Sequence, residues 1–331
     1  MITKEETTYL KAIAIILIIL SHFWGWIAES TQILKVIGSS LAQSAVFLFL
    51  FLSGYGVMQS YLNKGIENFW KRRLLKIYVP FLLISLPELL LEIWHYRQNI
   101  QDMYIRSTFL SALGLFPDNL LDGTFWFISF ILLQYAAFYI SFRIKANRGV
   151  QRCVHIILVL IVYCVFKQYF TWTCENDIYG FGFLLGSVLP ELKDTKPKSK
   201  KINMWFIAAM SFAGYIFTLM RFENAGYRFL NCLCLCFIEI VSVMAFYHLR
   251  GEVKWLKWIG VYSYELYLTE GFFFWHKALY DMVGYNYLGL ALHFCVILIL
   301  SIFIQKISMK ISNVLSQNIQ IGDYKRNGRY I

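Results

Sequence analysis

Residues 11–22 read KAIAIILIILSH, so a lysine and a histidine enclose ten residues that are nearly all apolar. The apolar run extends on both sides to cover about residues 9–28. About 20 such residues are enough for a helix to cross a bilayer. Eleven helical steps make three turns plus about 20°, so Lys11 and His22 face the same side. The stretch predicts a membrane-spanning helix with one polar stripe.

The rest of the chain has the same apolar character. Of its 331 residues, 58% are hydrophobic and 15% are charged, whereas soluble domains carry about 45–50% apolar and about 25% charged residues. We therefore predict an all-α, polytopic membrane protein with about ten transmembrane helices. The ten candidate segments cover residues 9–28, 39–61, 77–96, 124–142, 153–170, 178–190, 203–220, 229–248, 258–275 and 286–305.

The basic residues indicate how these segments are oriented. If the N-terminus lies in the cytoplasm, 24 of the 31 lysines and arginines fall in the inner segments. The positive-inside rule then predicts that both termini are cytoplasmic. The formal net charge of +11 does not predict a nucleic-acid partner, because the charges lie between long apolar runs and not on one polar face. We expect residues 1–310 to form the membrane domain and residues 311–331 a short cytoplasmic tail.

Ionisable residues inside the predicted membrane segments are candidates for function, since each is costly there unless it is paired or wetted. Lys11 and His22 are the first such pair. The helical rise places His22 about 16 Å deeper than Lys11. A lysine near the membrane surface and an imidazole deep in the membrane, on one helical face, suit a ligand with an anionic group at one end and a reactive group at the other. The structural alternative is a snorkelling lysine and a histidine that bonds within the bundle.

Glu270 lies in the segment 258–275, about 18 Å from its inner edge. That depth is close to the depth of His22, and Ser263 and Tyr267 share the same helical face. We predict that Glu270 orients or charges His22, as a carboxylate does for a general base. The alternative is that Glu270 pairs with another buried donor.

Arg72, Arg73 and Lys76 form a basic cluster at the inner end of the third segment. Arg73 and Lys76 are three residues apart, which places them on one helical face. Such a cluster can hold phosphate groups at the cytoplasmic surface. The alternative is that these residues only set the topology and contact lipid headgroups.

Glu88, Glu92 and His95 follow one another along a stripe in the outer half of the third segment. We interpret this stripe as a place where a hydroxyl-bearing acceptor enters from outside. The spacing is not a specific metal-binding signature, so no metal is expected. Glu239 is a further intramembrane carboxylate, and the sequence shows no partner for it.

Five short motifs follow one another along the chain: Lys11-x10-His22, FLSGY at 51–55, Arg73-x-x-Lys76, GTFWF at 123–127, and Gly260 with Ser263-Tyr264 and Tyr267-Leu268. Taken together and in this order, they make the chain resemble the acyltransferase 3 family over nearly its whole length. In two places the sequence departs from the family pattern. Lys76 replaces the second arginine of an Arg-x-x-Arg element, and a lysine cannot form the bidentate phosphate contact of an arginine. Glu270 stands where the family often has histidine.

The resemblance implies transfer of an acyl group, usually acetyl, from cytoplasmic acyl-CoA to a hydroxyl of an extracytoplasmic or lipid-linked polysaccharide. The expected donor is acetyl-CoA, and the expected partners are acyl-CoA, the glycan acceptor and membrane lipids, without metal or nucleic acid. The expected location is a plasma membrane, multi-pass and bacterial. We also expect a stand-alone form, without the extracytoplasmic hydrolase-like domain that some relatives carry.

These expectations give each candidate residue a role. The CoA phosphates lie at the basic cluster, and the pantetheine arm threads between the first, second and ninth segments. His22 either deprotonates the acceptor hydroxyl or briefly carries the acyl group, while Glu270 stabilises its imidazolium. The predicted CoA-binding residues are Lys11, Arg72, Arg73 and Lys76, and the predicted substrate-binding residues are Glu88, Glu92, Trp126, Ser263 and Tyr267.

The main alternative function is a transporter or flippase for a lipid-linked saccharide. Such a protein would use the same basic residues at the inner membrane surface, and the same buried carboxylates, as a path across the membrane. Transporters often carry internal repeats and paired broken helices, and the sequence shows no internal repeat. Dependence on acyl-CoA distinguishes the two functions.

Overall fold

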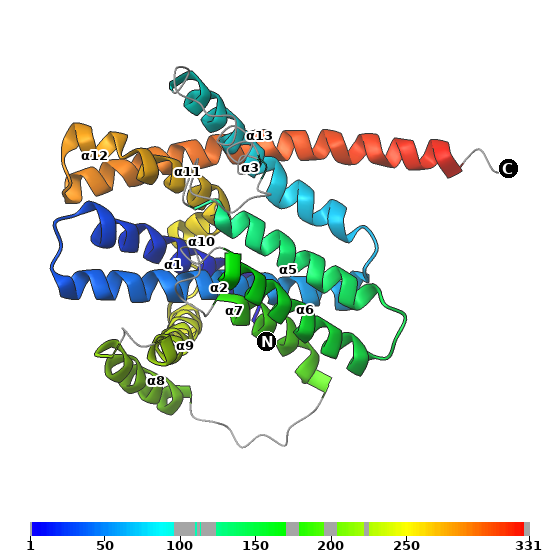
Figure 1. Ribbon diagram of the computed structural model, residues 1–331, viewed down its shortest axis with the longest axis horizontal. Coiled ribbons are helices and arrows are strands. Elements are labelled where there is room, and N and C mark those ends of the chain that lie inside the picture. Colours follow the sequence, from blue (N-terminus) through cyan, green and yellow to red (C-terminus); the bar gives the residue numbers. More distant parts are fainter. Residues whose placement is uncertain are drawn as a thin grey trace.

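The computed structural model describes residues 2–95, 124–169, 179–194, 204–221 and 225–327, together with Leu110 and Leu113. Within these ranges the chain is built from helices, and no strand occurs. The elements are α1 (Lys4–His22), the π-helix η1 (Phe23–Ile27), α2 (Gln32–Lys64), α3 (Phe69–His95), α5 (Trp126–Arg143), α6 (Arg148–Tyr169), α7 (Tyr179–Val188), the 3-10 helix η2 (Leu189–Asp194), α8 (Met204–Leu219), α9 (Ala225–Arg250), α10 (Lys254–Val261), α11 (Ser263–His276), α12 (Ala278–Val283) and α13 (Tyr287–Asn327) (Figure 1).

Seven helical stretches of the described residues are long and apolar enough to cross a membrane, and two shorter apolar helices accompany them. The turns between them alternate between the two ends of the bundle. The α2–α3 and α5–α6 turns lie at the right of Figure 1, whereas the α1–α2 connection and α12 lie at the left. Such an alternation is expected of a chain that crosses a membrane several times. The chain is therefore an all-α, polytopic membrane protein, as predicted.

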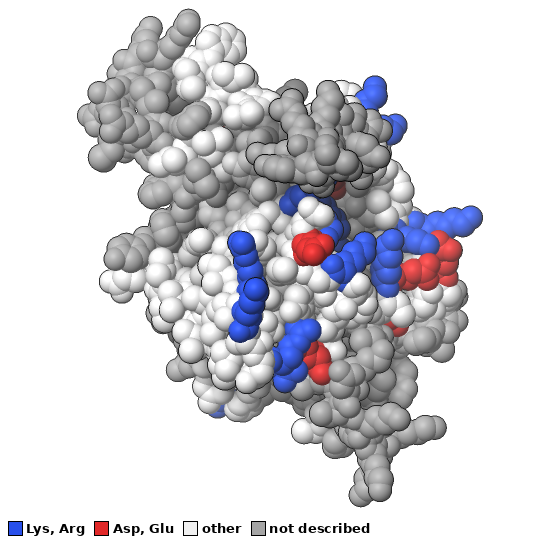
Figure 2. Space-filling view, turned by 90° about the vertical axis from the view of Figure 1, so that its right-hand side faces the viewer, with Lys and Arg blue, Asp and Glu red and all other residues white. Residues whose placement is uncertain are grey.

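Lysines and arginines are spread over the end of the bundle that holds the α2–α3 and α5–α6 turns. Figure 2 looks onto this end and shows blue side chains with fewer red ones among the described residues. This is the end that the sequence predicts to be cytoplasmic, and its charge agrees with the positive-inside rule. The side of the membrane on which each terminus lies stays a prediction, as does the domain boundary at residue 310.

Helix α1 is the central element of the bundle. It begins with a capping box, in which the Glu6 amide donates to Thr3 Oγ1 over 3.1 Å and the Thr3 amide donates to Glu6 Oε2 over 2.7 Å. Two backbone donors at the helix start are thereby satisfied. Helix α1 then packs against α2, α9, α10 and α11. This position places the end of α1, where His22 lies, inside the bundle.

The predicted single helix over 258–275 is wrong, because the chain breaks into α10 and α11 at Tyr262. The break follows a close crossing of α10 over α1. A Cβ added at Gly260 would lie 2.0 Å from the carbonyl oxygen of Thr8, so only glycine fits there. Past this crossing the chain changes direction and α11 starts at Ser263. Hydropathy does not reveal a break of one residue inside an apolar run.

Glycines also allow the close crossing of α2 and α7. A Cβ at Gly54 would lie 2.1 Å from the carbonyl oxygen of Phe183, and one at Gly186 would lie 1.9 Å from that of Phe51. Small residues let backbones approach in this way in membrane helices. Close packing against α7 therefore explains the small residues of the FLSGY run at 51–55.

We expect Gly54→Ala to destabilise the bundle by about 1–3 kcal/mol, the usual cost of overpacking. The added methyl group would overlap backbone atoms of α7, so the helices must move apart. Gly56→Ala is the matched control, since a Cβ at Gly56 meets nothing within 4 Å. Thermal unfolding of the two purified variants in detergent tests this expectation. Equal midpoints would show that the α2–α7 crossing is not tight.

Candidate active site

His22 and Glu270, 248 residues apart, are in hydrogen-bond contact, with 2.7 Å between His22 Nδ1 and Glu270 Oε1. His22 is the last residue of α1, where the helix widens into the π-helix η1, and such π-helical turns are frequent at functional sites. Glu270 lies in the middle of α11 and its side chain is 1% exposed, whereas that of His22 is 21% exposed. The predicted contact is present, while the catalytic roles stay predictions.

Two contacts fix the imidazole ring of His22. Its ring stacks on that of Phe274 with 4.3 Å between centroids and 15° between planes. Because an ionised carboxylate can only accept, the hydrogen of the bond to Glu270 belongs to Nδ1 of the ring. In this tautomer Nε2 carries the lone pair. An imidazole held in this way can accept a proton at Nε2 or attack a carbonyl carbon from it.

Lys11, on the same stripe of α1 as His22, forms a basic cluster with Arg73 and Lys76 of α3. Lys11 is half-buried and lies within electrostatic range of Lys76, Arg73 and Glu265. Lys76 is exposed and interacts with Arg73 and Glu265 as well. Lys4 also acts on Lys76, so four cations face one acidic group, and the surplus of positive charge favours a bound anion. The structure brings together Lys11, Arg73 and Lys76, which the sequence predicts to hold CoA phosphates.

Arg72 and Arg73, the two arginines predicted to bind CoA, have different surroundings. The guanidinium of Arg72 donates to the carbonyl oxygen of Glu67 over 2.6 Å and to that of Gly65 over 3.3 Å, which ties down the α2–α3 turn. Arg73 lies over the rings of Phe69 and Tyr135, at 5.8 and 5.5 Å from their centroids. These rings hold Arg73 by cation–π attraction. A phosphate contact of Arg72 stays a prediction.

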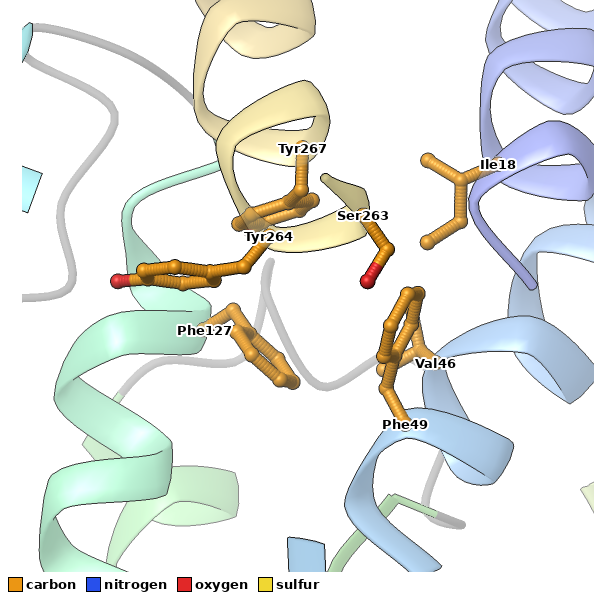
Figure 3. Close-up of a pocket in the computed structure, with 7 residues that line it drawn as sticks. All are labelled: Ile18, Val46, Phe49, Phe127, Ser263, Tyr264 and Tyr267. Atoms are coloured by element: carbon orange, nitrogen blue, oxygen red, sulfur yellow. The ribbon is translucent and has the colours of Figure 1, made fainter. Parts of the chain in front are cut away.

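A small cavity lies between α1, α2, α5 and α11 (Figure 3). Its walls are apolar apart from the Ser263 hydroxyl, which points into it, while the Tyr264 hydroxyl points away. Ile18 lines the cavity, seven residues after Lys11 and four before His22, so all three share one face of α1. The cavity therefore lies beside the stripe that joins the basic cluster to His22. It is lined by Ile18, Val46, Phe49, Phe127, Ser263, Tyr264 and Tyr267.

The structure places two predicted substrate-binding residues, Ser263 and Tyr267, in the wall of this cavity. The Tyr267 hydroxyl donates to the carbonyl oxygen of Thr124, which ties α11 to the start of α5. Trp126 does not line the cavity, and its ring contacts those of Phe127 and Phe130 instead. The binding roles of all three stay predictions.

On the outer half of α3, Glu88 is buried and its Oε1 lies 3.4 Å from His276 Nε2. The sequence gives no sign of this pairing. The side chains of Glu92 and His95, which the sequence places on the same stripe, lie outside the described part of the structure. The acceptor-binding roles of Glu88 and Glu92 stay predictions.

The fold gives several polar residues contacts that the sequence does not predict. Glu265 joins the basic cluster, and Gln305 Nε2 donates to its Oε2 over 3.5 Å. Glu239, which has no partner in the sequence pattern, accepts from Ser44 Oγ over 2.9 Å. His293 is buried beside the His22–Glu270 pair. The available signal was only the presence of acids and histidines in apolar segments.

These features define a class of protein, a polytopic membrane bundle with a part-buried histidine–carboxylate pair and a basic cluster shared by α1 and α3. A family described as an acyltransferase domain matches residues 6–305, so the chain belongs to the acyltransferase 3 family. The family resemblance stated from the motifs is thereby confirmed. Comparisons with curated proteins and with solved structures found no match.

Proposed function

We propose that the protein transfers an acetyl group from cytoplasmic acetyl-CoA to a hydroxyl of an extracytoplasmic or lipid-linked polysaccharide. Its proposed location is the plasma membrane of a bacterium. The observation that carries the proposal is the 2.7 Å contact of His22 with Glu270, on the helix stripe that also bears Lys11. Membership of an acyltransferase family supports the general reaction.

In the proposed complex Lys11, Arg73 and Lys76 hold the phosphates of CoA by charge-assisted hydrogen bonds. The pantetheine arm runs along α1 past Ile18, where the walls of the cavity are apolar. The length of α1 from Lys11 to His22 is about 16 Å, which a pantetheine arm can span. The thioester then lies at the imidazole of His22.

In the reaction the acceptor oxygen forms a bond to the thioester carbonyl carbon, and the carbon–sulfur bond breaks. The hydroxyl proton passes to the His22–Glu270 pair and from there to the sulfur, so CoA leaves as a thiol. Passage through an acyl group on His22 Nε2 has the same overall balance. In either route the buried carboxylate stabilises the imidazolium that forms.

The proposal is tested with isolated membranes that contain the full chain and isotope-labelled acetyl-CoA. We expect label in the glycan or lipid-linked glycan fraction, and none from membranes that lack the protein. Unlabelled propionyl-CoA and free acetate serve as competitors, and only the thioester should reduce incorporation. Movement of a lipid-linked saccharide without any use of acetyl-CoA would favour the transporter and contradict the proposal.

A further inference from the structure

His293 of α13 is a buried imidazole that the proposed reaction has not used. The residue is 1% exposed, and its ring centroid lies 5.3 Å from that of Tyr280 and 6.3 Å from that of Phe273. Phe273 is one turn of α11 beyond Glu270, about 4.5 Å along the helix. His293 therefore lies close to the level of the His22–Glu270 pair.

The pairing of α11 with α13 supports this placement. Thr269 Oγ1 and Ser301 Oγ are 3.0 Å apart, and Thr269 Oγ1 also donates to the carbonyl oxygen of Ile297 over 3.4 Å. One turn further along α11, and one turn back along α13, the same register brings Phe273 opposite His293. Glu270 and His22 both act electrostatically on His293.

Two polar atoms at this place lack a hydrogen-bond partner among the described residues. They are Oε2 of Glu270 and Nδ1 of His293, and both are buried. Buried polar atoms of this kind are normally satisfied by a protein group, a water or a ligand. Oε2 of a carboxylate accepts a hydrogen bond, and Nδ1 of an imidazole donates one in the appropriate tautomer.

A hydroxyl group matches this pair of atoms, because it donates one hydrogen bond and accepts others. We propose that Glu270 Oε2 and His293 Nδ1 together bind one hydroxyl, and that in the working enzyme it is the hydroxyl of the acceptor. The inference rests on the proposed function and adds the place where the acceptor oxygen binds. The hydroxyl hydrogen then faces the carboxylate that already holds His22.

Three substitutions of His293 distinguish a hydrogen bond at Nδ1 from simple packing. The amide nitrogen of His293→Asn lies near the position of Nδ1, that of His293→Gln lies near Nε2, and His293→Leu has no donor. We expect His293→Asn to keep kcat within about 3-fold of wild type and the other two to lose at least about 10-fold, the range for one lost hydrogen bond. The KM for acetyl-CoA should change by less than 2-fold in all three.

The measurement is label transfer from acetyl-CoA into glycan in isolated membranes, together with release of CoA thiol. If the bound hydroxyl belongs to the acceptor, His293→Leu should raise the ratio of CoA released to glycan acylated, because water can still enter. An unchanged ratio with the same loss in rate would show a resident water and overturn the acceptor assignment. Equal activity of all three variants would overturn the hydrogen bond itself.

His155→Gln is the matched control, since His155 is also buried, also has an unpartnered Nδ1 among the described residues, and bonds to Ser187 of α7. We expect this variant to transfer label at the wild-type rate. Failure of the proposed function would appear differently, as absence of transfer by the wild-type protein itself.

Discussion

Replacing His22 by alanine is expected to lower acyl transfer from acetyl-CoA by about 10²–10⁴-fold, the contribution of one positioned acid–base group. Glu270→Gln keeps the size of the side chain and an oxygen toward His22 Nδ1, but it removes the charge. We expect a smaller loss for that variant, because a neutral amide stabilises an imidazolium less well than a carboxylate does. Label entering the glycan fraction of isolated membranes measures both rates.

The two residues should behave as one unit. The double variant His22→Ala/Glu270→Gln is expected to be slower than His22→Ala by much less than the loss that Glu270→Gln causes alone, because groups that act together are strongly non-additive. His155→Ala provides the control for loss of a buried histidine at a distant place between α6 and α7. If the two losses multiplied in the double variant, Glu270 would act independently of His22 and the coupled pair would be disproved.

Replacing Lys11 or Lys76 by alanine should raise the KM for acetyl-CoA by about 10- to 100-fold, since a hydrogen bond to a charged group contributes about 1.5–3 kcal/mol. The kcat should change little, because these residues lie away from the reacting carbon. Arg143→Ala is the control, as Arg143 is exposed and bonds only to Tyr139 of its own helix among the described contacts. Initial rates at varied acetyl-CoA concentrations measure the effect.

A second donor separates phosphate binding from an indirect effect on folding. Acetyl-pantetheine carries the thioester but none of the phosphates of CoA. With this donor the wild-type protein and the Lys11→Ala variant should react at equal rates. A persistent difference would show that Lys11 supports the fold or the thioester position and does not bind phosphate.

Much of the fold could be predicted from the sequence because a bilayer restricts what a chain can do. Apolar runs of about 20 residues must form helices there, since every backbone polar group has to be satisfied internally. The break at Tyr262 and the close crossings at Gly54 and Gly260 could not be predicted in detail. They depend on which helices meet, and hydropathy does not record that.

For the candidate site, the sequence predicts only how residues are arranged on each single helix. The spacing of Lys11 and His22 places both on one face of α1, since helical periodicity is a local property. The partner Glu270 was predicted from depth alone, and the contact of 2.7 Å required α11 to lie against α1. Glu265 and His293 were overlooked, because nothing in their own segments indicates the distant residues they lie near.

The membrane character, the helical class and the family can be read from the amino-acid sequence, since composition, apolar run length and short ordered motifs do not depend on how the helices pack. The packed helices are needed to see that Glu88 meets His276, that Glu239 meets Ser44, and that His293 lies beside the His22–Glu270 pair. Contacts between residues far apart in the chain follow from helix packing, in which glycines and side-chain shape select the neighbours. A pattern within one segment does not determine which other segments it packs against.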